Sequence, residues 1–116
     1  MTRRRAKRVV TPTRRGLIRL IGSPLLLWEG QSLPLPAKAF GVIALLTTEP
    51  SRSLPRHRIR DCLWGEFPQE KASANLRQTL ARVRKIEQEK AIVILNVDGD
   101  RITLNSEQFD IDLITA

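Results

Sequence analysis

The chain has 116 residues, enough for one domain with one hydrophobic core, and 41% of them are apolar. That fraction can bury a core without disulfides or a metal, and the single cysteine excludes a disulfide framework or a zinc cluster. No apolar run approaches the roughly 20 residues of a membrane span, and no apolar segment of a secretory signal follows the basic N-terminus. We therefore expect a cytoplasmic protein without membrane contact.

The net charge of +8 is concentrated at the N-terminus. Residues 1–15 contain seven of the 20 basic residues and no acidic one, which leaves 13 basic and 12 acidic residues in the rest of the chain. This segment lacks apolar periodicity and contains Thr-Pro-Thr, a pattern that predicts a disordered arm. Its cations would contact nucleic-acid phosphates, and the alternative is a tail that only improves solubility. The cations expected at phosphates are Arg3, Arg4, Arg5 and Arg8.

Three short apolar runs predict a small antiparallel sheet near the N-terminus. A Gly-Ser-Pro break separates the first two runs, and a Glu-Gly-Gln turn separates the last two. The prolines of the third run cannot donate to a β-ladder, so it is expected at an edge. The predicted strands are Leu17–Ile21, Leu25–Trp28 and Ser32–Leu35.

Two helices are predicted next. The first covers Ala37–Thr48, with a proline at its start and another just after its end. A brief extended link, Ser51–Leu54, leads to the second helix, which begins at Pro55 and has Gly65 as its C-cap. The spacing within this second helix predicts a buried stripe and an outward basic face. The stripe consists of Ile59, Cys62 and Leu63, and the outward face of Arg56, Arg58 and Arg60.

The third predicted helix, Ala72–Glu89, has two different faces on a wheel of 3.6 residues per turn. The apolar face is expected in the core and consists of Ala72, Leu76, Leu80, Val83 and Ile86. The opposite face is basic and holds Ala74, Arg77, Gln78, Ala81, Arg84 and Lys85, with Asn75 and Arg82 on a flank. Insertion into a DNA major groove would explain this face, because Arg reads guanine and Asn or Gln can read adenine. The alternative is an ordinary solvated face, on which Glu87 and Glu89 form local pairs.

A β-hairpin is predicted after the third helix. Ile92–Val97 and Arg101–Leu104 have strand-like periodicity, and the Asp-Gly between them is a strong hairpin signal. Next to a helix in the major groove, such a hairpin would reach the neighbouring groove or backbone, as in the winged form of helix-turn-helix docking. Arg101 would then enter a narrow minor groove, whereas phosphate would repel Asp98 and Asp100 at the tip.

The sequence offers no set of residues for catalysis, a cofactor or a metal. His57 is the only histidine and lies in an arginine-rich helix, where a solvated role is expected. Cys62 is expected to pack in the core, and so is Trp64. For Trp28, near a turn, core packing and a base-stacking role both stay open. We therefore expect neither enzymatic activity nor a cofactor.

Several segments together resemble a known family. Cys62–Gly65 reads CLWG and Ala74–Arg84 reads ANLRQTLARVR, while Gly22–Pro24 and Gly30 match an N-terminal hairpin and Val97–Leu104 matches a wing. In this order and spacing they resemble the OmpR/PhoB-type winged helix. Within that family they are most similar to the N-terminal DNA-binding domain of SARP-like bacterial activators, which precedes a bacterial transcriptional activator domain.

The resemblance implies sequence-specific binding of double-stranded DNA for transcriptional regulation. In the third helix, Asn75, Arg77 and Arg82 match positions that face the major groove, and Arg101 matches the wing arginine. Many relatives have an aromatic residue before that arginine, where this chain has Asp100.

The resemblance also implies partners and boundaries. The loop Glu66–Gln69 matches a turn that can touch RNA polymerase, and two copies of such a domain can bind direct repeats as a homodimer. Phe109–Asp112 resembles the segment where relatives pass into the next domain. The expected organisation is a basic arm at 1–15, a winged-helix domain at 16–108 and a C-terminal segment at 109–116 that starts a linker.

The expected fold class is α+β, as a winged helix-turn-helix with an N-terminal antiparallel sheet, three helices and a C-terminal β-hairpin wing. The residues expected to bind DNA in the third helix are Asn75, Arg77, Gln78, Arg82, Arg84 and Lys85, joined by Arg101 in the wing. Two other functions stay open. One is an RNA-binding or ribosome-associated basic module, and the other is a winged helix used only for protein contacts.

Overall fold

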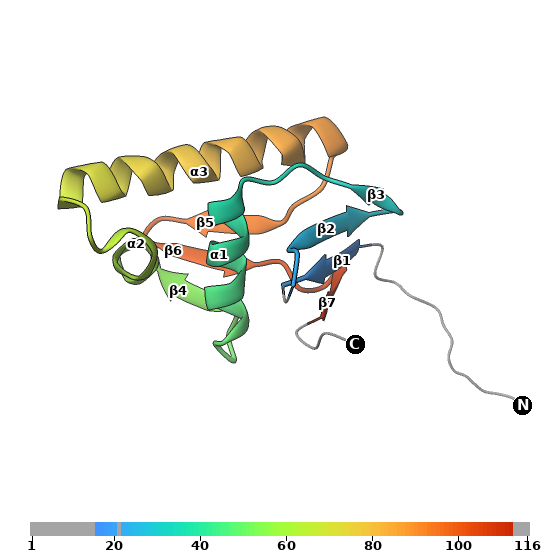
Figure 1. The fold of residues 1–116 in the computed structure, drawn as a ribbon. Helices are drawn as coiled ribbons and strands as arrows, with labels where there is room; N and C mark the ends of the chain where they lie inside the picture. The colour runs from blue at the N-terminus through green and yellow to red at the C-terminus, as the bar shows by residue number, and fades with distance from the viewer. Residues whose placement is uncertain (1–15, 21, 113–116) are drawn as a thin grey trace, which may run out of the picture. The chain divides into compact units, whose positions relative to one another are not determined.

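The computed structural model describes residues 16–20 and 22–112, which form two compact units. The first unit combines residues 16–33 with 107–112, and the second comprises residues 34–106. The expected α+β class is confirmed, because each unit contains a sheet and the second adds three helices (Figure 1). The predicted basic arm lies outside the described residues.

The first unit is a four-stranded sheet. Its strands are β1 (Gly16–Arg19), β2 (Leu25–Trp28), β3 (Gln31–Ser32) and β7 (Phe109–Asp112), in the order β3-β2-β1-β7. Glu29 and Gly30 form the turn between β2 and β3, and both have the positive φ that a type I′ turn requires. Strand β3 is shorter than the predicted Ser32–Leu35, since the prolines at 34 and 36 cannot extend the ladder.

Strand β7 lies in the segment that was expected to start a linker. Residues 109–112 instead pair in parallel with β1. The ring of Phe109 covers Gly16 so closely that a Cβ at residue 16 would collide with it. The same ring packs against the Trp28 indole, with the ring centroids 5.5 Å apart. Trp28 is 7% exposed and is therefore a core residue, which resolves the choice that the sequence left open.

The second unit contains three helices and a three-stranded antiparallel sheet. The helices are α1 (Ala37–Thr47), α2 (Arg56–Trp64) and α3 (Gln69–Lys90), and the strands are β4 (Ser53–Pro55), β5 (Leu95–Asp98) and β6 (Arg101–Leu104). The strand order is β4-β6-β5. Strand β4 falls in the segment that was predicted as a link between helices, and its pairing with β6 makes that link part of the sheet.

One side of this sheet is apolar. Along β6, Ile102 and Leu104 are buried, whereas Arg101 alternates to the other side. The register places Leu54 opposite Ile102 and Leu95 opposite Leu104, so these four side chains share one face. Helix α1 contacts β6 and α2 contacts β4, and this apolar face therefore belongs to the core of the unit.

Helix α3 begins at Gln69, three residues before the predicted start. Its predicted apolar stripe is confirmed: Ala72, Leu76 and Val83 are buried, and Leu80 and Ile86 are half-buried. Thr79 is buried among them. Its hydroxyl donates to the Asn75 carbonyl at 2.9 Å, so burial leaves that hydroxyl with a partner.

The junction between α3 and β5 is held by Glu87. Ala91 ends the helix with a left-handed φ of 56°, and its N–H donates to the Glu87 carbonyl. The Glu87 carboxylate accepts the N–H groups of Ile94 at 2.7 Å and Leu95 at 2.9 Å. The N–H groups of Ile92 and Ile94 donate to Glu87 and not to a neighbouring strand, and β5 begins at Leu95 and not at the predicted Ile92. In the alternative of an ordinary solvated face, Glu87 would pair with nearby cations, but its carboxylate accepts these backbone groups.

Replacing Glu87 with alanine should lower the free energy of unfolding by about 2–3 kcal/mol, because two backbone N–H groups lose a charged acceptor. Urea denaturation followed by far-UV circular dichroism measures this change. The matched control is Glu89→Ala, which removes an exposed carboxylate and should change stability by less than about 0.5 kcal/mol. Equal effects of the two variants would contradict the stabilising role of the Glu87 bonds.

Candidate nucleic-acid interface

The outward face of α3 carries cations that have no partner in the described part of the chain. Their side chains are exposed and form neither a hydrogen bond nor an ion pair there. These cations are Arg77, Arg82, Arg84 and Lys85. Ala74 and Ala81 lie on the same face and are exposed too, so small residues separate the long cationic ones. The face is therefore available to an anionic partner.

The helix divides its polar residues between two edges of this face. At about 100° per residue, Asn75, Gln78 and Arg82 form one row. Arg77 and Arg84, seven residues apart, form a second row, and Arg77 lies about 140° from Arg82 around the helix. The three residues matched to major-groove positions are thus split, with Asn75 and Arg82 on one edge and Arg77 on the other.

The second row lines two hollows beside the β5–β6 hairpin. Arg77 contributes to a basic hollow of about 400 Å³, together with Arg56, His57, Arg60, Ser73, Leu76 and Asp100. Arg84 contributes to a hollow of about 340 Å³ between α3 and residues 92–97, whose walls include the exposed side chains of Val93 and Val97. Only the first hollow brings several cations together.

The orientation of α2 supplies two of those cations. Trp64 is 4% exposed and Ile59 is fully buried, although they lie about 140° apart around the helix. Because both are buried, the sector of the helix surface between them also faces inward. Arg56 and Arg60 lie in this sector and are half-buried. The expectation that these two arginines point away is wrong, whereas Arg58 is exposed as predicted.

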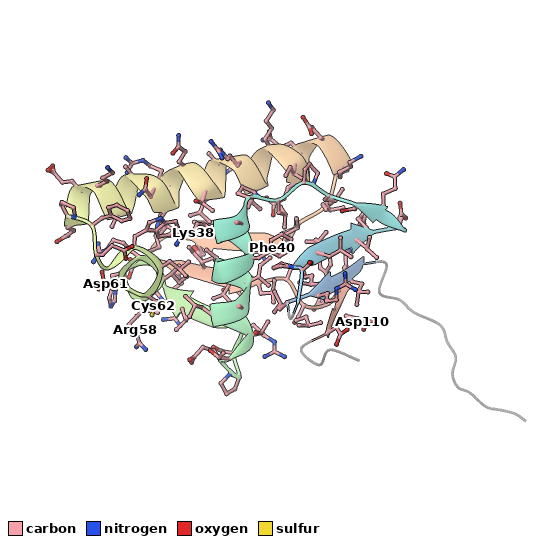
Figure 2. The ribbon with its side chains drawn as sticks, viewed as in Figure 1. Lys38, Phe40, Arg58, Asp61, Cys62 and Asp110 are labelled. Atoms are coloured by element: carbon pink, nitrogen blue, oxygen red, sulfur yellow. The ribbon has the colours of Figure 1, made fainter. Side chains whose placement is uncertain are left out.

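The same orientation exposes Cys62, which was expected in the core. Figure 2 shows Cys62 and Arg58 on the side of α2 that faces away from α3. Trp64 is buried as predicted, and the large area of its ring outweighs that of the small thiol. Lys38 Nζ lies 5.5 Å from the centroid of the Trp64 ring and donates to the Leu63 carbonyl at 3.2 Å, which holds the end of α2 in place.

The tip of the β5–β6 hairpin is attached to α2. Gly99 and Asp100 form the turn, and the Asp100 carbonyl accepts the N–H of Arg56 at 2.7 Å. Arg101 Nε donates to Ser53 Oγ at 3.1 Å, and one of its terminal nitrogens donates to the Ser53 carbonyl at 3.3 Å. The Arg101 side chain therefore lies along β4 on the polar side of the sheet. It does not extend from the tip, as minor-groove insertion would require.

Other cations of this unit serve the fold. A terminal nitrogen of Arg52 donates to the Thr47 carbonyl at 2.7 Å and to the Glu49 carbonyl at 3.3 Å, which closes the end of α1. Arg60 Nε donates to Asp61 Oδ1 at 3.0 Å. These contacts separate structural cations from the unpaired cations of α3.

The two units differ in charge. Residues 34–106 contain 12 basic and eight acidic residues, a net charge of +4. The described residues of the other unit contain one basic and four acidic residues, a net charge of −3. The net charge of the chain after residue 15 is close to zero because the charges of the two units nearly cancel. The exposed cations of α3 belong to the positive unit.

Arg3, Arg4, Arg5 and Arg8 lie outside the described residues. Within residues 16–20 and 22–112, no three His, Cys, Asp or Glu side chains are grouped so that they could hold a metal ion. None of the helices in that part of the chain combines the length and the apolar character needed to cross a membrane. No family model, curated protein or solved structure matches the chain.

The orientation of α2 leaves the Cys62 thiol exposed. We therefore expect it to react with a thiol reagent in the folded protein at a rate close to that in denaturant, whereas a buried thiol would be inert. Absorbance of the released chromophore measures the rate. In a Cys62→Ser background, Ile59→Cys places the only thiol at a buried position of the same helix and should react slowly. A wild-type thiol that reacts only after unfolding would contradict this orientation.

Proposed function

We propose that residues 34–106 form a winged helix-turn-helix domain that binds double-stranded DNA sequence-specifically and regulates transcription, as a binding module and not an enzyme. The exposed face of α3 carries the proposal. On a helix of 22 residues it presents exposed Arg and Gln side chains and the half-buried Asn75, and none of these side chains bonds to another described residue. These side-chain types can read the edges of guanine and adenine in the major groove.

The elements around α3 support this proposal. Residues 65–68 connect α2 to α3, and a connection of about four residues that contains glycine is typical of a helix-turn-helix. Gly65 is the C-cap of α2, as predicted, and a Cβ there would collide with the Asp61 carbonyl. The β5–β6 hairpin follows α3 and is joined to β4, as expected for a wing that accompanies a recognition helix.

The two rows of α3 suggest a division of roles. The row of Asn75, Gln78 and Arg82 would read base edges, while the alanines of the same face allow the backbone to approach them. The hairpin would contact the DNA backbone and not enter the minor groove, because Ser53 holds Arg101 against β4. The basic arm would add salt-dependent contacts to phosphates.

We also propose the loop Glu66–Gln69 as the surface that touches RNA polymerase. Phe67 in this loop is 37% exposed, and Lys71 Nζ lies 5.4 Å from the centroid of its ring. An exposed aromatic ring with a cation over it is suited to a protein contact. Two copies of the domain would occupy direct repeats as a homodimer on DNA.

Fluorescence anisotropy with a labelled duplex DNA and a structured RNA of equal length tests the proposal against its rivals. At physiological salt, we expect tighter binding to a duplex that contains the preferred site than to the RNA. Equal or tighter binding to RNA would favour an RNA-binding module. An absence of binding to either nucleic acid would favour a domain used only for protein contacts. Each of these two results would overturn the proposal.

Arg82→Ala should weaken binding to the preferred duplex by about 1–3 kcal/mol and relax the preference at one base position, because Arg82 belongs to the proposed reading row. Anisotropy titrations against single-base variants of the site measure both effects. Arg58→Ala removes an equal charge from α2 and should leave the base preference intact. Equal weakening by Arg82→Ala on every sequence would contradict a base-reading role.

Deletion of residues 1–15 should flatten the dependence of affinity on salt. The log–log slope should fall by up to about 0.9 for each phosphate that the arm neutralises in the full chain. Binding measured over a series of chloride concentrations gives this slope for the full chain and for the deletion variant. An unchanged slope would mean that the arm does not touch DNA.

A further inference from the structure

A basic hollow lies between α2, α3 and the β5–β6 turn, on the edge of α3 away from the proposed reading row. Three arginines, Arg56, Arg60 and Arg77, share its wall with the single carboxylate of Asp100. The lining therefore has a net charge of +2 when His57 is neutral. Leu76 is the one apolar side chain among the lining residues, so the hollow suits an anion better than an apolar ligand.

The three arginines differ in how they are held. Arg60 is fixed by Asp61 Oδ1 at 3.0 Å and by Ser73 Oγ at 3.5 Å. The guanidinium groups of Arg56 and Arg77 have no partner among the described residues. The guanidinium groups of Arg56 and Arg77 can therefore donate to a ligand, next to the Arg60 group that Asp61 and Ser73 hold in place. Guanidinium groups match phosphate oxygens in geometry and charge.

The start of α2 adds to the positive potential of the hollow. Helix α2 has no side-chain cap, and the N–H of Arg56 is taken by the Asp100 carbonyl at 2.7 Å. The amides that follow it in the first turn have no acceptor within the helix, and the positive end of the helix dipole lies there. These groups support the arginines, which supply the charge.

We propose that this hollow binds one phosphate of the DNA backbone, and that Arg77 belongs to this phosphate site and not to the base-reading row. The inference rests on the proposed function. A helix in the major groove has a sugar–phosphate backbone along each edge. If the row of Asn75, Gln78 and Arg82 faces the bases, the edge about 140° away, with Arg77, faces one of those backbones.

Titration with inorganic phosphate at constant ionic strength, followed by amide NMR of the full chain, tests the hollow without DNA. We expect saturable shifts at Arg56, Ser73 and Arg77, and none at Arg82. Shifts that do not saturate, or that are as large at Arg82 as at Arg77, would overturn the site. The positions of the shifting amides distinguish the hollow from any binding by the arm.

Three charge variants sharpen this titration. Arg56→Gln should weaken phosphate binding about tenfold, the loss expected for one charge-assisted hydrogen bond. Asp100→Asn should strengthen it, because the one carboxylate in the wall loses its charge while the backbone carbonyl that holds Arg56 is kept. Arg58→Gln removes an equal charge from the exposed side of the same helix and should have no effect. Equal effects of Arg56→Gln and Arg58→Gln would mean that only total charge matters, which would overturn the site.

Duplex binding separates this inference from the proposed function. Arg77→Gln should weaken binding by the same factor on preferred and scrambled duplexes, and it should lower the log–log salt slope by about 0.9. Relaxed preference at one base position would show that Arg77 reads a base, which overturns the inference and leaves DNA binding intact. If the wild-type protein binds no duplex, the proposed function fails, and the backbone-phosphate assignment that rests on it falls as well.

Discussion

Burial of the Trp64 indole together with Ile59 is the packing constraint on which the positive surface depends. The two side chains lie about 140° apart on α2, so the helix can bury both only by turning the sector between them inward. Arg56 and Arg60 occupy that sector. A large aromatic ring gains more from burial than a thiol does, and this difference explains why Cys62 is left outside. One tryptophan therefore determines where two arginines lie.

The positive charge on α3 and in the hollow also depends on which groups the neighbouring carboxylates bind. Glu87 is next to the cations of α3 in sequence, yet its carboxylate accepts two backbone N–H groups and forms no ion pair with the described cations. Asp61 pairs with Arg60, a cation already positioned by the fold. The cations of the outward face consequently have no ion-pair partner among the described residues. Arg60 is held by Asp61 and also lines the hollow, whereas the cations on the outward face of α3 form no bond with another described residue. It is these outward cations that need a functional explanation.

The sequence predicted what local periodicity controls. The apolar stripe of α3, the three helices, the Asp-Gly hairpin and the cap at Gly65 all follow from patterns within a few residues. Strands β4 and β7 could not be predicted in this way. They have three and four residues, and each pairs with a partner far along the chain, so their own sequences carry only a weak signal.

The candidate site was predictable in part. Spacing on α3 identified its exposed cations, because a long amphipathic helix shows its outward face directly. The helical wheel also separates Arg77 from Arg82, but nothing in the sequence shows that the hairpin lies along the Arg77 edge. The hollow depends on the orientation of α2, in which Trp64 is buried and Cys62 is not, and on the hydrogen bond from the Arg56 N–H to the Asp100 carbonyl. Such tertiary contacts decide that Arg56 lines the hollow and that Arg101 lies against β4.

Selection of duplex sites from a random library by the full chain tests whether the outward face of α3 reads DNA sequence. We expect enrichment of one motif, whose length and repeat spacing would also show whether two copies bind side by side. Recovery of sequences with no shared motif, at salt concentrations where the protein still retains DNA, would contradict this expectation.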